Sequence, residues 1–133
     1  AISCDINEME VLIGDKDEQR ASIKELMRTL LKARKKDLSK SQFYLALAQQ
    51  FYEGKVTEDL RKNYIEEWNI IKYNFTKNRI LEWLPDIYIA LELSLRSAQY
   101  GSLEGKRLAA KIYRDKKFDR CDIEIANFID SIN

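Results

Sequence analysis

Apolar residues recur at intervals of three and four along most of this chain, and this spacing limits its fold more than any other feature. Ile23, Leu26 and Leu30 show the pattern early, and Ile125 and Ile129 continue it near the other end. An α-helix brings residues at these intervals onto one face, whereas a strand requires strict alternation. One proline and four glycines occur in 133 residues, and sheet-rich chains need more turn formers. We therefore predict an all-α fold, a helical bundle of four to six helices.

The length corresponds to one domain with a sizeable core. We divide it into an N-terminal arm at 1–15, a core bundle at 16–117 and a C-terminal helix at 118–133. The longest apolar row starts after Thr57 and predicts one long central helix of about 27 residues, or ~40 Å. Pro85, the proline of the chain, either kinks this helix or serves as the first residue of a new one.

Several residues mark expected helix ends. Ser39 is followed by Gln42 at capping-box spacing, so we expect a helix to begin at Ser39. Gly54 is expected just past the end of that helix, because glycine adopts the left-handed conformation found there. Thr57 and Ser102 are expected to cap two later helices through their hydroxyl groups. In the helix after Ser102 we expect Leu103 and Leu108 to point inward with Ile112 and Tyr113.

The large side chains divide into a core set and an interface set. Residues that continue the apolar rows are assigned to the core: Phe43, Leu47, Phe51, Tyr64, Trp68, Ile71, Phe75 and Ile112. Aromatic residues beside Arg and Asn are enriched where protein partners meet. The interface candidates of this kind are Tyr44, Asn69, Tyr73, Arg79, Trp83 and Tyr88. The alternative for this second set is a polar flank that faces water.

The sequence offers few groups for catalysis. It contains no histidine, which removes the commonest general base and the commonest metal ligand. Cys4 and Cys121 cannot form a Cys/His metal site, and a disulfide between them remains open. Glu66 and Glu67 are adjacent, so they point about 100° apart on a helix and cannot share a site. We expect no catalytic, cofactor-binding or metal-binding residues, and no enzymatic activity.

Charge gives no clear sign of nucleic-acid binding. The 23 basic and 22 acidic residues give a formal net charge of +1, so no global positive field is expected. The lysines of "KARKKD" suit the carboxyl end of a helix. They and "RLAAKIYRDKK" could form a basic surface with aromatic residues, but interleaved acids weaken this interpretation. We expect DNA contact to be weak or indirect.

Location follows from what the sequence lacks. No stretch approaches the ~18 consecutive apolar residues that would span a bilayer. The N-terminal stretch "AISCDINEMEV" has no basic segment followed by an apolar run, so it does not read as a signal peptide. We expect no membrane contact, and a cytoplasmic location, associated with the nucleoid, or a nuclear one in a eukaryote.

Between about residues 20 and 115 the chain resembles the helical domain of a GINS complex subunit of the archaeal type. "IKELMRTLL" matches its first helix, and "DLSKSQFYLAL" matches the polar link into a Phe-Tyr pair, here Phe43-Tyr44. "EEWNIIKYNFTKNRILEW" matches its long helix, with an acid, an Asn and an Arg-Ile pair. "SLEGKRLAAKIYRD" matches a Leu-acid turn and an Ile-Tyr pair. Pro85 and the lack of a visible β-rich domain depart from the family pattern.

The resemblance implies a non-enzymatic assembly subunit without cofactors. GINS subunits form tetramers and join the MCM ring and a RecJ-like protein in the replicative helicase, so the implied partners are other protein subunits. The residues leave two alternatives open. One is a small helical subunit of an RNA-guided, CRISPR-type defence complex, which requires a continuous basic stripe. The other is a helical inhibitor or immunity-type protein, which requires a strongly charged surface.

Overall fold

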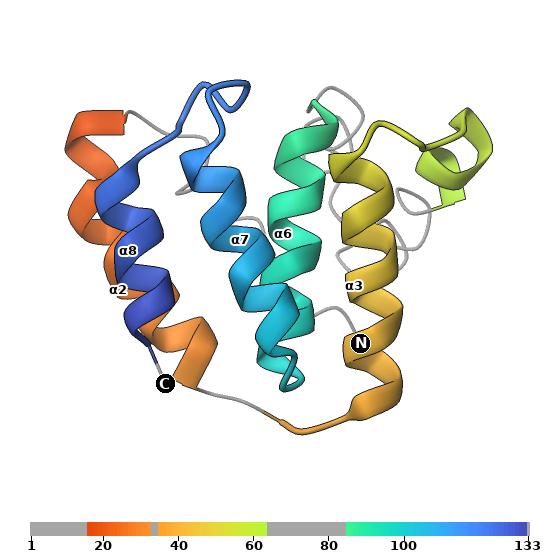
Figure 1. Cartoon of the computed structure of the whole chain (residues 1–133), viewed down its shortest axis with the longest axis horizontal. Coiled ribbons are helices and arrows are strands. Elements are labelled where there is room, and N and C mark those ends of the chain that lie inside the picture. Colours follow the sequence, from red (N-terminus) through yellow and green to blue (C-terminus); the bar gives the residue numbers. More distant parts are fainter. Residues whose placement is uncertain (1–15, 33–34, 64–84, 133) are drawn as a thin grey trace, which may run out of the picture.

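The structure, a computed structural model, describes residues 16–32, 35–63 and 85–132. Within these ranges lie a helical segment at 58–63 and five helices, α2 (Lys16–Lys32), α3 (Leu38–Tyr52), α6 (Asp86–Gln99), α7 (Leu103–Arg114) and α8 (Ile123–Ser131). No strand occurs in these ranges. The predicted all-α bundle is therefore confirmed (Figure 1). The N-terminal arm and most of the predicted long central helix lie outside the described residues.

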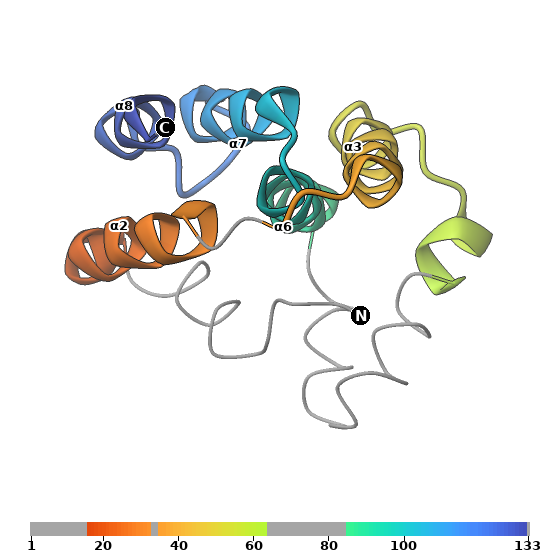
Figure 2. The same ribbon diagram turned by 90° about the horizontal axis from the view of Figure 1, so that it is seen from below.

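The helices form two layers around α6. Figure 2 shows α3, α7 and α8 in one layer and α2 and α6 in the other. Helix α6 packs against α3 and α7 of the other layer, and also contacts α2 beside it. Helix α2 in turn packs against α8. Residues 88–98 of α6 are all buried, so this helix is the centre of the core. None of the described helices is long and apolar enough to cross a membrane.

The start of α3 corrects one predicted helix end. Asp37, not Ser39, is the N-cap, and its Oδ1 accepts the backbone N–H of Lys40 at 3.1 Å. Ser39 lies within the first turn and is exposed. Both residues favour caps, and the structure uses the earlier one. The Asp37 backbone N–H also donates to the carbonyl of Tyr100 at 3.0 Å, which fixes Asp37 at the end of α6.

The other predicted helix ends are confirmed. Thr57 Oγ1 accepts the N–H of Leu60 at 3.1 Å, and Ser102 Oγ accepts the N–H of Gly105 at 3.0 Å. Gly54 follows α3 with a φ of 70°, a conformation that a side chain would strain. Pro85 is the N-cap residue directly before α6, so a helix begins here, one residue after the position that the second of the two predicted roles gave it.

The buried face of α3 differs from the predicted one. Phe43 was assigned to the core, yet it is 53% exposed. The buried residues of α3 are Ser41, Tyr44, Ala48 and Phe51, a stripe that crosses the two predicted rows diagonally. The cause is the contact with α6, where Ser97 Oγ donates to the carbonyl of Ser41 at 2.7 Å. This bond turns Tyr44 inward and Phe43 outward.

Gly105 lets α6 and α7 approach closely. A Cβ placed on Gly105 would lie 2.8 Å from Ser97 Cβ and 2.9 Å from the carbonyl oxygen of Ser94. Both distances are shorter than a carbon atom can tolerate, so only glycine fits this contact without a shift of the helices. Farther along α7, Ile112 and Tyr113 are buried, as predicted, and Leu108 is partly buried. Leu103 was expected to point inward and is instead 52% exposed, because it is the first residue of α7.

Asp122 joins α8 to the rest of the bundle. Its Oδ1 accepts the N–H groups of Glu124 and Ile125 at 3.0 and 3.3 Å, which caps α8. Its Oδ2 accepts Arg20 Nε from α2 at 2.7 Å. Burial works to raise the pKa of Asp122, but the hydrogen bonds from Arg20 and from the two backbone groups outweigh it and lower the pKa. Asp122 is therefore a buried carboxylate that connects α2 to α8.

Candidate interaction surfaces

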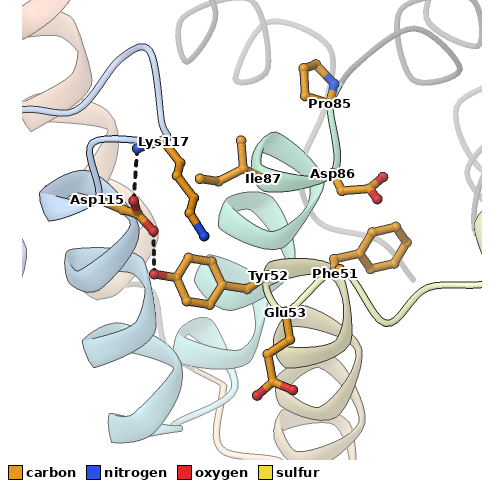
Figure 3. A pocket seen from close by; sticks show the side chains of 9 residues that line it. Phe51, Tyr52, Glu53, Pro85, Asp86, Ile87, Asp115 and Lys117 are labelled. Carbon is orange, nitrogen blue, oxygen red and sulfur yellow. Dashed lines mark hydrogen bonds between the residues drawn. The ribbon is translucent and has the colours of Figure 1, made fainter.

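An open cleft of about 530 Å³ lies at the carboxyl end of α3. Figure 3 shows it between the start of α6 and the loop that follows α7. Its walls combine apolar and polar side chains. The lining residues are Phe51, Tyr52, Glu53, Gly54, Pro85, Asp86, Ile87, Asp115 and Lys117.

One polar group of the cleft is held by two hydrogen bonds. Tyr52 OH donates to Asp115 Oδ2 at 2.7 Å, and the backbone N–H of Lys117 donates to Asp115 Oδ1 at 2.9 Å. These two bonds lower the pKa of the Asp115 carboxyl. Burial, together with the bond to Asp115, raises the pKa of Tyr52 to about 12. At neutral pH the pair is a fixed carboxylate and a protonated phenol, which suits binding and orientation rather than proton transfer.

Two further contacts stiffen the cleft wall. Asp86, at the start of α6, forms an ion pair with Arg61 of the 58–63 segment. Lys111 of α7 lies with its Nζ 5.4 Å from the centre of the Tyr52 ring. Three separate parts of the chain are thus connected around the opening, so the cleft is formed before any partner arrives.

The centre of α6 contains a buried ion pair. Glu92 and Arg96 are 0% and 1% exposed and pair with one another one turn apart. The Arg96 guanidinium also lies 5.8 Å from the centre of the Tyr44 ring. Burying two charges is costly even when they are paired. The pair is covered on all sides, so it serves the architecture of the core and offers no surface to a ligand.

Sequence reasoning did not find the Glu92–Arg96 pair, although a signal was present. Glu and Arg stand at i, i+4 in "IALELSLRSAQ", a helix that is apolar on several sides. A charged pair within a helix without a polar face must be buried. The Tyr52–Asp115 pair gave no such signal, because 63 positions separate its members.

The interface candidates within the described residues belong to the core. Tyr44 and Tyr88 are each 7% exposed, which leaves them little surface for a partner and corrects their assignment. Tyr88 OH donates to Asp119, and burial together with this bond raises the pKa of Tyr88 to about 12. The remaining interface candidates lie outside the described residues. They are Asn69, Tyr73, Arg79 and Trp83.

The core candidates have mixed outcomes. Phe51 and Ile112 are 1% and 0% exposed, which confirms both, and Leu47 packs against the core while partly buried. Phe43 was wrongly assigned to the core, because its side chain is exposed. The others lie outside the described residues. They are Tyr64, Trp68, Ile71 and Phe75.

The described residues contain no group of three His, Cys, Asp or Glu side chains placed to hold a metal ion. Cys121 is a free thiol of intermediate exposure, and Cys4 lies outside the described residues. Comparisons of the chain with protein-family models, with curated proteins and with solved structures found no match.

Proposed function

We propose that this chain is a non-enzymatic assembly subunit of the GINS type, which binds other protein subunits and supports a replicative DNA helicase. The sequence resemblance over residues 20–115 supports this proposal, as does the all-α fold of the described part. The absence of histidine from the sequence supports a binding role over acid–base catalysis. In such an assembly the chain would act by positioning its partners.

The observation that carries the proposal is the cleft at the end of α3. A volume of about 530 Å³ is within the range of sites that enclose a small ligand or a few side chains. Pro85 and Ile87 offer apolar surface, and the Asp115 carboxylate is held in place by Tyr52. This combination suits a short segment of a partner protein that carries an apolar side chain beside a hydrogen-bond donor.

The first experiment is to purify the tagged protein gently from its own host, measure its native mass and identify the co-eluting chains by mass spectrometry. A tetramer-sized particle that contains further helical subunits, with MCM and a RecJ-like protein in weaker association, is the expected result. A lone monomer at cellular concentration would overturn the proposal. A particle that carries RNA would support the RNA-guided alternative in its place.

A matched pair of variants tests the role of the cleft. Lys117 lines the cleft and Lys116 does not, and both side chains are exposed. We expect Lys117→Glu to weaken partner association about tenfold or more, as charge reversal at a contact does, and Lys116→Glu to leave it unchanged. Equal effects of the two variants would show that the cleft is not the docking site.

A further inference from the structure

Three lysines gather at the end of the bundle opposite the cleft. Lys35 and Lys36 lie in the link between α2 and α3, and Lys40 lies in the first turn of α3. Figure 1 shows this link at the bottom of the molecule, below the start of α3 and beside the turn between α6 and α7. We call the surface formed by Lys35, Lys36, Lys40, Phe43 and Tyr100 the basic end. The length of α3, 15 residues or roughly 22 Å, separates it from the cleft.

The backbone of the basic end is fixed in place. The N–H of Lys35 donates to the carbonyl of Gln99 at 2.9 Å, and the N–H of Asp37 donates to the carbonyl of Tyr100 at 3.0 Å. A Cβ on Gly101 would lie 3.6 Å from Lys36 Cγ, so the link lies directly on the α6–α7 turn. The lysines are therefore presented by an ordered segment, which lowers the entropy lost when a ligand binds.

The three cations have no carboxylate partner in the described part of the chain. Its ion pairs involve other residues, and the side chains of Lys35, Lys36 and Lys40 are exposed. The acid beside them, Asp37, accepts the N–H of Lys40 as the α3 cap. The three lysines thus outnumber the one acid that lies among them in the sequence, and an excess of cations is what a phosphate backbone requires.

Helix dipoles do not explain all three lysines. The structure ends α2 at Lys32, so Lys35 and Lys36 lie beyond the helix whose end they were expected to stabilise, although the end of α6 is close. Lys40 lies at the amino end of α3, where a positive charge is unfavourable. The dipole of α3 therefore does not account for Lys40.

Aromatic rings accompany these charges. Lys40 Nζ lies 5.2 Å from the centre of the Tyr100 ring, and Tyr100 stacks on Tyr44 with ring centres 5.9 Å apart. Phe43 packs edge-on against Tyr44 at 5.4 Å and remains 53% exposed. Lys40 and Phe43 are three residues apart on one helix, so they lie side by side on its surface. An exposed, well-supported ring thus lies next to a lysine that has no carboxylate partner among the residues the structure describes.

We infer that the basic end binds single-stranded nucleic acid. The lysines would contact successive phosphates, and a base would stack on Phe43, the combination used by proteins that bind single strands without sequence preference. A duplex fits less well, because its bases are not free to stack on a side chain. An acidic protein segment would use the lysines but would not require a flat aromatic face. This binding is independent of the protein partners proposed above.

The test is fluorescence anisotropy with labelled 15-nucleotide oligothymidine and oligouridine at several salt concentrations. The triple variant Lys35→Gln, Lys36→Gln, Lys40→Gln is compared with a control, Lys55→Gln, Lys62→Gln, Lys116→Gln, which makes the same change in net charge at exposed lysines elsewhere. We expect the first triple to lower affinity at least tenfold and to reduce the salt slope by about 2, at ~0.7 per single-strand phosphate contact. The control triple should bind like the wild type.

The variant Phe43→Ala tests the stacking contact separately, and circular dichroism checks that each variant is folded. We expect it to weaken binding about tenfold without changing the salt slope. Equal loss in both lysine triples, or full binding by Phe43→Ala, would overturn the inference, as would equally tight binding of a polyglutamate peptide. Preference for oligouridine over oligothymidine would identify RNA as the ligand, and the reverse would identify DNA. Because the cleft variants leave the basic end intact, failure here and failure of the assembly proposal can be told apart.

Discussion

Replacement of Gly105 by alanine tests the closest helix contact of the bundle. The added methyl group would lie 2.8 Å from Ser97 Cβ and 2.9 Å from the Ser94 carbonyl oxygen. One of these atoms belongs to the backbone and the other is attached directly to it, so relief requires α6 and α7 to separate. Overpacking of this kind costs about 1–3 kcal/mol. We expect a cost in the upper half of this range, because three atoms, Ser97 Cβ, Ser97 Oγ and the Ser94 carbonyl oxygen, would lie closer than 3.0 Å to the new methyl group. The higher helix propensity of alanine offsets at most about 1 kcal/mol of this cost.

We therefore expect Gly105→Ala to lower the free energy of unfolding by about 1–2 kcal/mol. Urea titration followed by far-UV circular dichroism measures this change, and the melting temperature should fall by roughly 3–8 °C. The control is Arg107→Ala on the exposed side of α7, where we expect a change within about 0.5 kcal/mol. A Gly105→Ala variant as stable as the wild type would refute the close approach of α6 and α7 at this position.

Four further substitutions test the core and its charges. Phe51→Ala should cost about 3–5 kcal/mol, whereas Phe43→Ala should cost less than about 1 kcal/mol, and urea unfolding of the two would reveal a reversed order. Glu92→Gln should destabilise the fold by about 3 kcal/mol or more, because it leaves the Arg96 cation buried without its carboxylate; an unchanged melting temperature would contradict the buried pair. The pKa of Asp122 is lowered in the folded state. The ionised carboxylate therefore stabilises the fold above the pKa of the unfolded chain, near 3.8, and this stabilisation is lost as the pH falls through the folded-state pKa. Asp122→Asn keeps a capping side chain but should show a weaker loss of stability as the pH falls below about 4. An acid titration identical to that of the wild type would count against the Arg20 contact.

Local signals predicted the elements and most of their ends. Thr57, Ser102 and Gly54 mark helix ends through their own backbone preferences, and Pro85 opens α6 because it lacks an N–H that the first turn does not need. Asp37 and Ser39 show the limit of this reasoning. Both side chains suit a cap, and the choice of Asp37 depends on its backbone bond to Tyr100, a contact that no local pattern contains.

The orientation of α3 could not be predicted for a related reason. Aromatic and apolar residues occupy two neighbouring rows of this helix, so either row satisfies the periodicity. Packing against α6 determines which row is buried, through the hydrogen bond from Ser97 to Ser41 and the stacking of Tyr44 on Tyr100. The cleft was missed because Tyr52 and Asp115 come from distant segments. Lys35 and Lys36 of the basic end were attributed to the last turn of a helix, whereas the structure places both in the link before α3.

The burial of residues 88–98 of α6 has a consequence for the order in which parts of the chain unfold. A helix of 14 residues is marginally stable in water by itself. This helix also contains the Glu92–Arg96 ion pair, which is buried only when the other helices are packed around it. Its amide protons should therefore exchange with solvent only when the whole bundle unfolds, at the rate set by global stability. The short α8, at the edge of its layer, can fray without disturbing that centre. Native-state hydrogen exchange would then divide the bundle into a slow central helix and a faster periphery.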